Sequence, residues 1–404
     1  MTYYRPIFAS LTLIAIAACG DDPTGPTREI TLSFCSNLSW VAYQNEGGAW
    51  TRLANSAGTY TLRATERLAI VTVHAPGPNL ATLELHFLTA DQAVTTFRCG
   101  VTPPTATKIL HGSVRGLGSN DQAYVMVGPS IAVVHAAIPT FTITGVRNGP
   151  VDVVATHMLP FSSQSVRVQR VIVRRAENRA NNSTMPALNF DSTEAFEPQY
   201  NTLTLTGVPA GSTIGAQTDF LTPSETLNPL GWNGVQGSSV PIYSVPASRL
   251  VQGDLQQLNA GTSHRHMLLY YTVPVDRTVA LGPEPSAPSF TTLESSPTLR
   301  LRVDVGAQPE YASQILFYLF QSSSLTDGRT IGLWATKEYF GDTPTTWSLT
   351  IPDLSGVEGF QSSWGLQPGS YTWNLLVHGR PFGFSPRSAR DGDVFYSAFL
   401  FGPS

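Results

Sequence analysis

The stretch TFTITG at residues 140–145 alternates apolar side chains, Phe141 and Ile143, with threonines. Successive side chains of a β-strand point to opposite faces, so this pattern places the apolar residues on one face and the threonines on the other. Similar runs, typical of half-buried strands, recur along the chain. They lie at residues 60–63, 68–73, 83–88, 107–114, 122–127, 130–135, 151–156, 166–175, 202–207, 298–305, 314–320, 330–335, 346–351, 370–378 and 394–400. The sequence therefore predicts an all-β protein.

The composition agrees with a chain of several β-domains. Charged residues make up only 13% of the 404 residues, whereas about 25% is usual. The 34 glycines and 30 prolines favour turns, and 42% hydrophobic residues are enough to form real cores. A net charge of −4 gives no electrostatic reason to bind nucleic acid. We expect tandem β-sandwich domains that do not bind nucleic acid.

Irregular or Pro- and Gly-rich segments divide the predicted strands into four β-domains. The dividing segments are residues 102–105 (TPPT), 177–198 and 282–288 (GPEPSAP). The predicted domains are a small β-domain at 29–101, a β-sandwich at 105–180, a β-domain with a loop-rich insert at 199–285, and a β-sandwich at 291–404. Within the third domain we expect residues 223–241 to be loop and residues 247–258 to hold one short helix.

A short apolar run at residues 7–18 follows Arg5 and ends in small residues. A positively charged start, an apolar centre and small residues at the end define a secretory signal. The run is too short to span a bilayer, which needs roughly 20 apolar residues. Residues 1–18 are therefore predicted to be a signal peptide, and the mature protein is predicted to be exported.

The sequence IAAC at residues 16–19 resembles the lipobox of bacterial lipoproteins. The resemblance implies cleavage before Cys19, acylation of the Cys19 sulfur and amino group, and attachment to a membrane through the lipid. The alternative is a plain signal peptide. Residues 19–28 would then be the lipidated cysteine and a short extended tether. Gly20, rather than Asp, follows the cysteine, which favours the outer membrane of the cell envelope over the inner one.

Two further cysteines, Cys35 and Cys99, flank the first predicted β-domain. An even pair of cysteines in an exported chain indicates a disulfide, which would join the first and last strands of that domain. The chain-entropy estimate for closing so long a loop is about 4 kcal/mol. Two free buried thiols are the alternative. A metal site is disfavoured because no CxxC motif or nearby histidine supports it.

Three segments of the second predicted domain carry a family resemblance: residues 112–117 (GSVRGL), 123–128 (AYVMVG) and 141–155 (FTITGVRNGPVDVVA). They resemble the carboxypeptidase regulatory-like, or transthyretin-like, β-sandwich, which a G-x-V-x-G strand opens and an F-x-I-x-G hairpin closes. Residues 138–140 (IPT) replace the Asp-Gly of that family. The resemblance implies an accessory β-domain and carries over no catalytic residues.

The last predicted domain contains residues 347–354 (WSLTIPDL) and 364–373 (WGLQPGSYTW). These segments resemble a fibronectin-III-like or immunoglobulin-like sandwich, in which a Pro-Gly turn precedes a Tyr-x-Trp strand. Three tryptophans of this region, Trp347, Trp364 and Trp373, are candidate ligand-binding aromatics that would stack on sugar rings. Burial in the domain core is the alternative that tryptophans on alternating strands favour.

Motifs of several enzyme classes are absent from the sequence. No G-x-S-x-G, H-E-x-x-H or glycine-rich phosphate loop occurs. His264 and His266 share one strand face but lack a third ligand, and Asp391 and Asp393 indicate a hairpin turn rather than a calcium loop. A basic strand at residues 166–175 suits a solvated edge strand. We expect no catalytic residue, no metal and no cofactor.

These observations favour a cell-envelope lipoprotein with a binding or structural role, in contact with an envelope glycan or a protein partner. Two alternatives stay open. One is a secreted or surface hydrolase of glycans or peptides with accessory sandwich domains, which would show a deep pocket with convergent carboxylates or histidines. The other is a carbohydrate-binding module that uses tryptophans and tyrosines of the C-terminal domain.

Overall fold

A computed structural model describes residues 27–34, 38–54, 58–77, 79–96, 107–160, 165–224, 226–324, 327–341 and 344–403. The predicted all-β class is confirmed, because strands dominate and are arranged in several sheets. The helices in this part of the chain are short. They are α1 (Ala90–Thr96), α2 (Lys337–Phe340) and the 3-10 turns η1 (Ala247–Arg249), η2 (Pro309–Tyr311), η3 (Ser362–Trp364) and η4 (Pro386–Ser388). No helix in the described ranges is long and apolar enough to cross a membrane.

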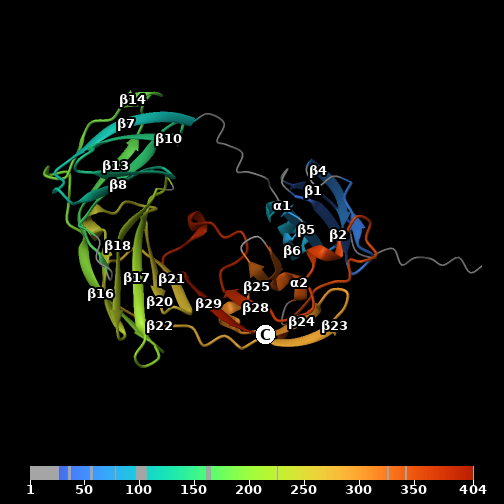
Figure 1. Cartoon of the computed structure of the whole chain (residues 1–404). Coiled ribbons are helices and arrows are strands. Elements are labelled where there is room, and N and C mark those ends of the chain that lie inside the picture. The colour runs from blue at the N-terminus through green and yellow to red at the C-terminus, as the bar shows by residue number, and fades with distance from the viewer. Residues whose placement is uncertain are drawn as a thin grey trace, which may run out of the picture.

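One sheet of 13 strands runs through the molecule and connects its two halves (Figure 1). In spatial order its strands are β12 (Ser165–Val166), β18 (Leu227–Gln236), β17 (Thr213–Leu221), β20 (Leu255–Gly261), β21 (Arg265–Tyr271), β29 (Val394–Pro403), β28 (Thr372–His378), β25 (Gln314–Ser324), β26 (Asp327–Thr336), β6 (Leu80–Thr89), β5 (Arg67–Gly77), β2 (Trp40–Asn45) and β3 (Thr51–Arg52). We call it the long sheet.

Two three-stranded sheets cover the same face of the long sheet. They are β19 (Ser239–Ser244), β16 (Gln199–Thr206) and β22 (Arg277–Ala280), and β23 (Ser289–Glu294), β24 (Arg300–Gly306) and β27 (Thr346–Thr350). Alternate residues of the long sheet, such as Ile214 and Phe317, are buried against them. The register through β21, β29 and β28 is continuous, so both cores lie on one side. The other side, from β18 to β26, is here called the open face.

The first strands of the chain cover the end of the long sheet that contains β6, β5 and β2. Strand β1 (Arg28–Phe34) pairs with β4 (Gly58–Ala64), and their apolar side chains pack with Ile70 of β5 and with α1. Ile70 points away from the core that contains its neighbour Val71. This side of the long sheet is therefore covered over β6, β5 and β2, next to the open face.

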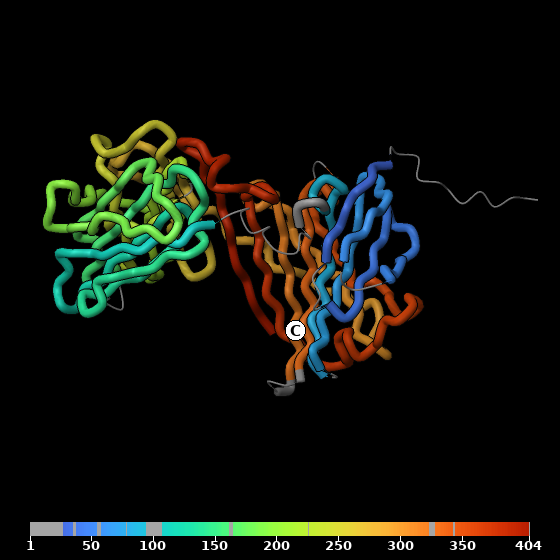
Figure 2. Tube along the Cα trace, turned by 90° about the horizontal axis from the view of Figure 1, so that it is seen from above, coloured from blue at the N-terminus to red at the C-terminus, as the bar shows by residue number. Residues whose placement is uncertain are grey.

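Residues 107–196 form a separate two-sheet sandwich around its own core. One sheet contains β10 (Thr140–Arg147), β7 (Thr107–Arg115), β14 (Ser183–Thr184) and β15 (Leu188–Asn189), and the other contains β13 (Val168–Glu177), β11 (Val151–Met158), β8 (Gln122–Val127) and β9 (Ser130–His135). A further apolar cluster, which includes Met158 and Phe220, joins this sandwich to the strands that follow. Figure 2 shows the sandwich beside the end of the long sheet.

Strands of the predicted 29–101 and 291–404 segments pair with each other. Strand β6 lies parallel to β26, with Leu83 opposite Ile331, and Trp40 shares one core with Phe317. The two segments, predicted as separate β-domains, thus contribute strands to the same sheet. Local alternation predicts which residues form strands, but the partner of a strand that is more than 200 positions away depends on packing.

The segment expected to be loop at 223–241 contains all of β18 and the start of β19. Gly231 has φ +147, a backbone conformation that favours glycine. Pro229 lies at an irregularity in the pairing with β17, where a proline is tolerated within a strand. Of the segment 247–258, which was expected to hold one short helix, only Ala247–Arg249 form a 3-10 helix, and Leu255 begins strand β20. Pairing with β17 and β21 overrides the local helix signal.

Candidate functional site

Two of the three tryptophans that the sequence singled out are buried. Trp347 is 3% exposed and Trp364 is 8% exposed, and the Trp364 ring packs on Trp40 at 6.3 Å between centroids. Trp373 is half-buried, stacks on Phe317 and donates a hydrogen bond from Nε1 to the Pro403 carbonyl. All three pack in or against the C-terminal core, as the core alternative expected. The lipidation residue Cys19 and the cysteines Cys35 and Cys99 lie outside the described residues.

The other polar motifs of the sequence are used in local structure. Asp391 Oδ1 accepts a hydrogen bond from the Thr272 amide, and Asp393 Oδ2 accepts one from the Arg390 amide. Both carboxylates therefore stabilise the turn before β29. On β13, Arg174 Nε donates a hydrogen bond of 2.6 Å to Glu194 Oε1, and the guanidinium donates two more to backbone carbonyls. No group of three or more His, Cys, Asp or Glu side chains that could hold a metal ion occurs among the described residues.

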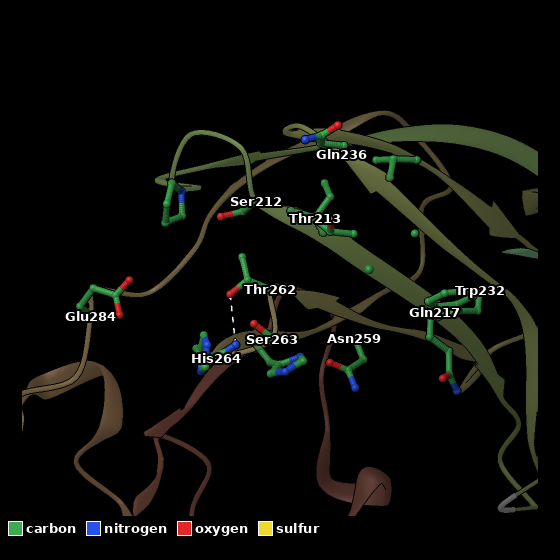
Figure 3. A pocket seen from close by; sticks show the side chains of 17 residues that line it. Ser212, Thr213, Gln217, Trp232, Gln236, Asn259, Thr262, Ser263, His264 and Glu284 are labelled. Carbon is green, nitrogen blue, oxygen red and sulfur yellow. Dashed lines mark hydrogen bonds between the residues drawn. The ribbon is translucent and has the colours of Figure 1, made fainter. Parts of the chain in front are cut away.

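A groove of about 830 Å³ lies on the open face, over β18, β17, β20 and β21 (Figure 3). The labelled side chains run from Trp232 and Gln217 at one end to His264 and Glu284 at the other. Hydroxyl, amide, imidazole and indole groups line the groove, together with glycines. Sequence reasoning singled out His264 and His266 among these residues but missed the others, because they come from four strands and from loops far apart in the chain.

The floor of the groove is a row of three glycines. Gly215 of β17 lies opposite Gly234 of β18 on one side and opposite Gly261 of β20 on the other, and His266 of β21 continues the row. Because glycine has no side chain, a ligand can approach the partly exposed backbone at Gly215 closely, whereas Gly234 and Gly261 are buried by their neighbours. At Gly261 a Cβ atom would lie 2.0 Å from the Arg265 carbonyl oxygen, so only glycine fits. The row thus adds no side chain to the floor of the groove.

The next row of residues gives the groove its wall. Trp232, Gln217 and Asn259 lie opposite one another on β18, β17 and β20. The Trp232 ring is half-buried, whereas the Gln217 and Asn259 side chains are exposed. An indole face next to two amides can hold the apolar face of a ligand while the amides exchange hydrogen bonds with its hydroxyl groups.

Two histidines and one carboxylate form the far rim. Burial lowers the pKa of His266, so its imidazole is neutral at physiological pH. The Thr262 hydroxyl accepts a hydrogen bond from the His264 amide and fixes the tight hairpin between β20 and β21. Glu284 faces Arg265, whose Nε is 3.2 Å from Glu284 Oε1. This pairing neutralises the one carboxylate of the described lining.

A buried carboxylate lies directly behind the wall. Asp219 accepts a hydrogen bond from Gln217 Nε2 at 3.0 Å and another from Gln257 Nε2 at 3.3 Å. Tyr270 in turn donates to Gln257 Oε1. Since Gln217 donates to Asp219 through Nε2, its NH2 group is turned inward, and its Oε1 can accept a hydrogen bond from a ligand. Burial raises the pKa of Asp219.

We expect the Asp219→Asn variant to be more stable than the wild type at neutral pH. The folded-state pKa of Asp219 is raised, so the folded protein favours the protonated carboxyl group. The stability that this group contributes is fully present below the unfolded pKa and is lost as pH rises through the folded pKa. The asparagine amide of the variant does not titrate, and the exposed Gln217 amide can turn to accept a hydrogen bond from it. The expected gain is about 1 kcal/mol in urea unfolding at neutral pH, and it should disappear near the unfolded pKa of aspartate, about 3.9.

The matched control is Asp353→Asn. Hydrogen bonds from the Ser355 side chain and backbone lower the pKa of Asp353, so this substitution should remove stability at neutral pH rather than add it. A gain at Asp219 that stays constant from acid to neutral pH would show that burial of the charge is not the cause.

Comparisons with known proteins add little to this description. No known protein family and no curated protein matches the chain. Among solved structures, it is similar to "The Bacillus anthracis TIE protein", with a TM-score of 0.15 and 6% sequence identity over 91% of this chain and 65% of that chain. The chain thus spans less than two thirds of that protein's length. A TM-score this low carries no argument about function.

Proposed function

We propose that the protein is a lipid-anchored protein of the bacterial cell envelope, outer membrane rather than inner, and that its groove binds a neutral glycan. The observation that supports glycan binding most directly is the row of three glycines beside Trp232, Gln217 and Asn259. A floor without side chains suits a flat ring, and the indole and amides match its apolar face and its hydroxyl groups.

The charge of the groove favours a neutral ligand. The described lining contains no lysine or arginine, and its carboxylate, Glu284, is paired with Arg265. Nucleic acids and other polyanions are usually held by lysine and arginine side chains. Ser212, Thr213 and Thr262 supply hydroxyl groups that both donate and accept hydrogen bonds. This chemistry suits the hydroxyl groups of a sugar.

The proposal includes the family resemblances of the sequence. The transthyretin-like segment at 105–180 and the fibronectin-III-like segment at 291–404 would act as structural β-modules that hold the groove away from the membrane. A hydrolase would need a second acidic group, because glycosidases use a pair of carboxylates. If the protein turns over a bound glycan and the Glu284→Gln variant does not, the proposed function changes from glycan binding to glycan hydrolysis.

The groove is tested by filling its floor. Gly215 has an ordinary φ, and a Cβ atom there would make only van der Waals contact with Trp232 at 3.4 Å. Gly215→Val should therefore fold normally and place a branched side chain where the ligand lies. We expect an at least 10-fold loss of affinity, or about 1.4 kcal/mol, for whichever neutral oligosaccharides the wild type binds on a glycan array.

Gly356→Val is the matched control, because a Cβ atom at Gly356 meets open space. It should bind as the wild type does. Equal affinity in the Gly215 and Gly356 variants, or no binding of any neutral glycan by the wild type, would reject the groove as a glycan site.

The lipid anchor is tested in cells. A palmitate analogue should label the wild-type protein, and Cys19→Ala should abolish the label, because Cys19 is the residue that the lipobox resemblance marks for acylation. A label that persists in the Cys19→Ala variant would contradict the anchor.

A further inference from the structure

The groove does not end at β21. Strand β29 pairs with β21 so that Ser397 lies opposite His266, and the Phe399 amide donates a hydrogen bond to the His264 carbonyl. Residues 395, 397, 399 and 401 of β29 therefore share the open face with the groove, while Ala398 and Leu400 point into or against the C-terminal core. The next strand along the sheet presents two aromatic rings beside the groove.

These rings and His264 form a continuous surface, which we call the aromatic ledge: His264, Phe399 and Phe401. The His264 and Phe401 rings are 5.8 Å apart between centroids, and the Phe399 and Phe401 rings are also 5.8 Å apart. His264 lines the groove as well. One side chain thus belongs to both features, so the ledge begins where the groove ends.

Phe401 is 61% exposed, an unusual position for so large an apolar ring. It is not on a free chain end. Phe401 lies opposite Asn374 in the β28–β29 pairing, and the Pro403 carbonyl accepts a hydrogen bond from Trp373 Nε1. The ring therefore belongs to a paired strand, and the strand pairing fixes its exposed position.

We propose that the aromatic ledge is a second subsite for the glycan chain that the groove binds, so that the site takes an oligosaccharide rather than a single sugar. This inference rests on the proposed function. The site would cross five neighbouring strands, from β18 to β29, or roughly 19 Å at the usual strand spacing. One sugar would lie over the glycines beside Trp232, and a later sugar would place its apolar face on Phe401.

Two observations favour the same glycan over another occupant. The ledge shares the open face and the side chain of His264 with the groove, so a ligand that leaves the groove along the row of His266 and Ser397 passes directly beside it. The polar neighbours Asn374 and Ser397 are uncharged, like the groove itself. An aromatic face with uncharged hydrogen-bonding neighbours is suited to a hydroxylated ring.

The test compares Phe401→Ala with the wild type against a length series. The probes are β-1,3- and β-1,4-linked gluco-oligosaccharides from disaccharide to octasaccharide, measured by calorimetry with the mature protein. We expect wild-type affinity to rise with length until the ledge is reached. Phe401→Ala should lose about 10-fold in affinity for the long chains and nothing for the disaccharide, whereas Gly215→Val should weaken both. Phe401→Tyr, which keeps a stacking ring, should restore the length dependence.

The outcomes separate the two proposals. Disaccharide binding that Gly215→Val abolishes, together with unchanged long-chain affinity in Phe401→Ala, overturns the ledge and leaves the groove. No binding of any length overturns both. A wild-type dimer in light scattering that Phe401→Ala converts to a monomer, without an effect on long chains, would show that Phe401 is covered by a second copy of the chain instead. Leu293→Ala, another exposed apolar residue, serves as the control.

Discussion

The Arg175→Ala variant is expected to lose about 3–5 kcal/mol of unfolding free energy, because it leaves a buried carboxylate without its partner. Arg175 binds Asp254 through two hydrogen bonds of 2.8 and 2.6 Å, and the Asp254 side chain is 0% exposed. Arg175 also lies 5.6 Å from the ring centroid of Phe220. The pair connects strand β13 of the 107–196 sandwich to the segment before β20, so its loss should weaken the contact between these two parts of the protein.

Urea unfolding followed by circular dichroism measures this effect, and Arg115→Ala is the matched control because Arg115 is exposed on the same sandwich. A double-mutant cycle with Asp254→Asn sharpens the result. If the penalty comes from an unpaired buried charge, the double variant should lose clearly less than the sum of the two single variants. Additive losses, or an Arg175→Ala variant as stable as Arg115→Ala, would contradict the explanation.

The Trp40→Ala variant should also lose about 3–5 kcal/mol, as large-to-small changes of buried aromatic residues do. Trp40 is 2% exposed and lies on β2, yet its ring packs on Phe360 at 5.4 Å and on Trp364 at 6.3 Å. Its Nε1 donates a hydrogen bond to the Glu358 carbonyl. The N-terminal segment thus supplies a central side chain to the core of the C-terminal segment.

The informative measurement is hydrogen exchange. Amide protection should fall in β24 and β27 of Trp40→Ala, although these strands are far from Trp40 in the sequence, because they share one core with it. Leu293→Ala, at an exposed position on β23, should leave protection unchanged. If the loss of protection in Trp40→Ala is restricted to β1–β6, the two segments fold independently despite the shared sheet.

Local alternation of apolar and polar residues predicts most of the strand positions in this chain. The predicted strands at 122–127 and 130–135 match β8 and β9 residue for residue, and the run at 140–145 lies inside β10. Strand β18 was missed because Gly231, Pro229 and two asparagines give it the composition of a loop. Its pairing with β17 and the burial of Leu230 stabilise it, and neither can be seen in the local sequence.

The groove was predictable only in part. Sequence reasoning placed His264 and His266 on one strand face, and both line the groove. The signal that could have led to the rest is a glycine two positions from a polar or aromatic residue, as in Gly215 with Gln217 and Trp232 with Gly234. Such pairs are common in turns, so without the strand register they do not single out a site. The three candidate tryptophans, Trp347, Trp364 and Trp373, were easier to single out in the sequence, but they pack in or against the core.

Residues close together in the chain account for the all-β class and for most of the strands, because both depend on the local alternation of apolar and polar side chains. An apolar run after a positive charge predicts an export signal in the same local way. The pairing of β6 with β26 and the alignment of Gly234, Gly215 and Gly261 in one row depend on tertiary packing. Register between strands is selected by the packing of two faces at once, and a shift of one residue would send every side chain to the other face.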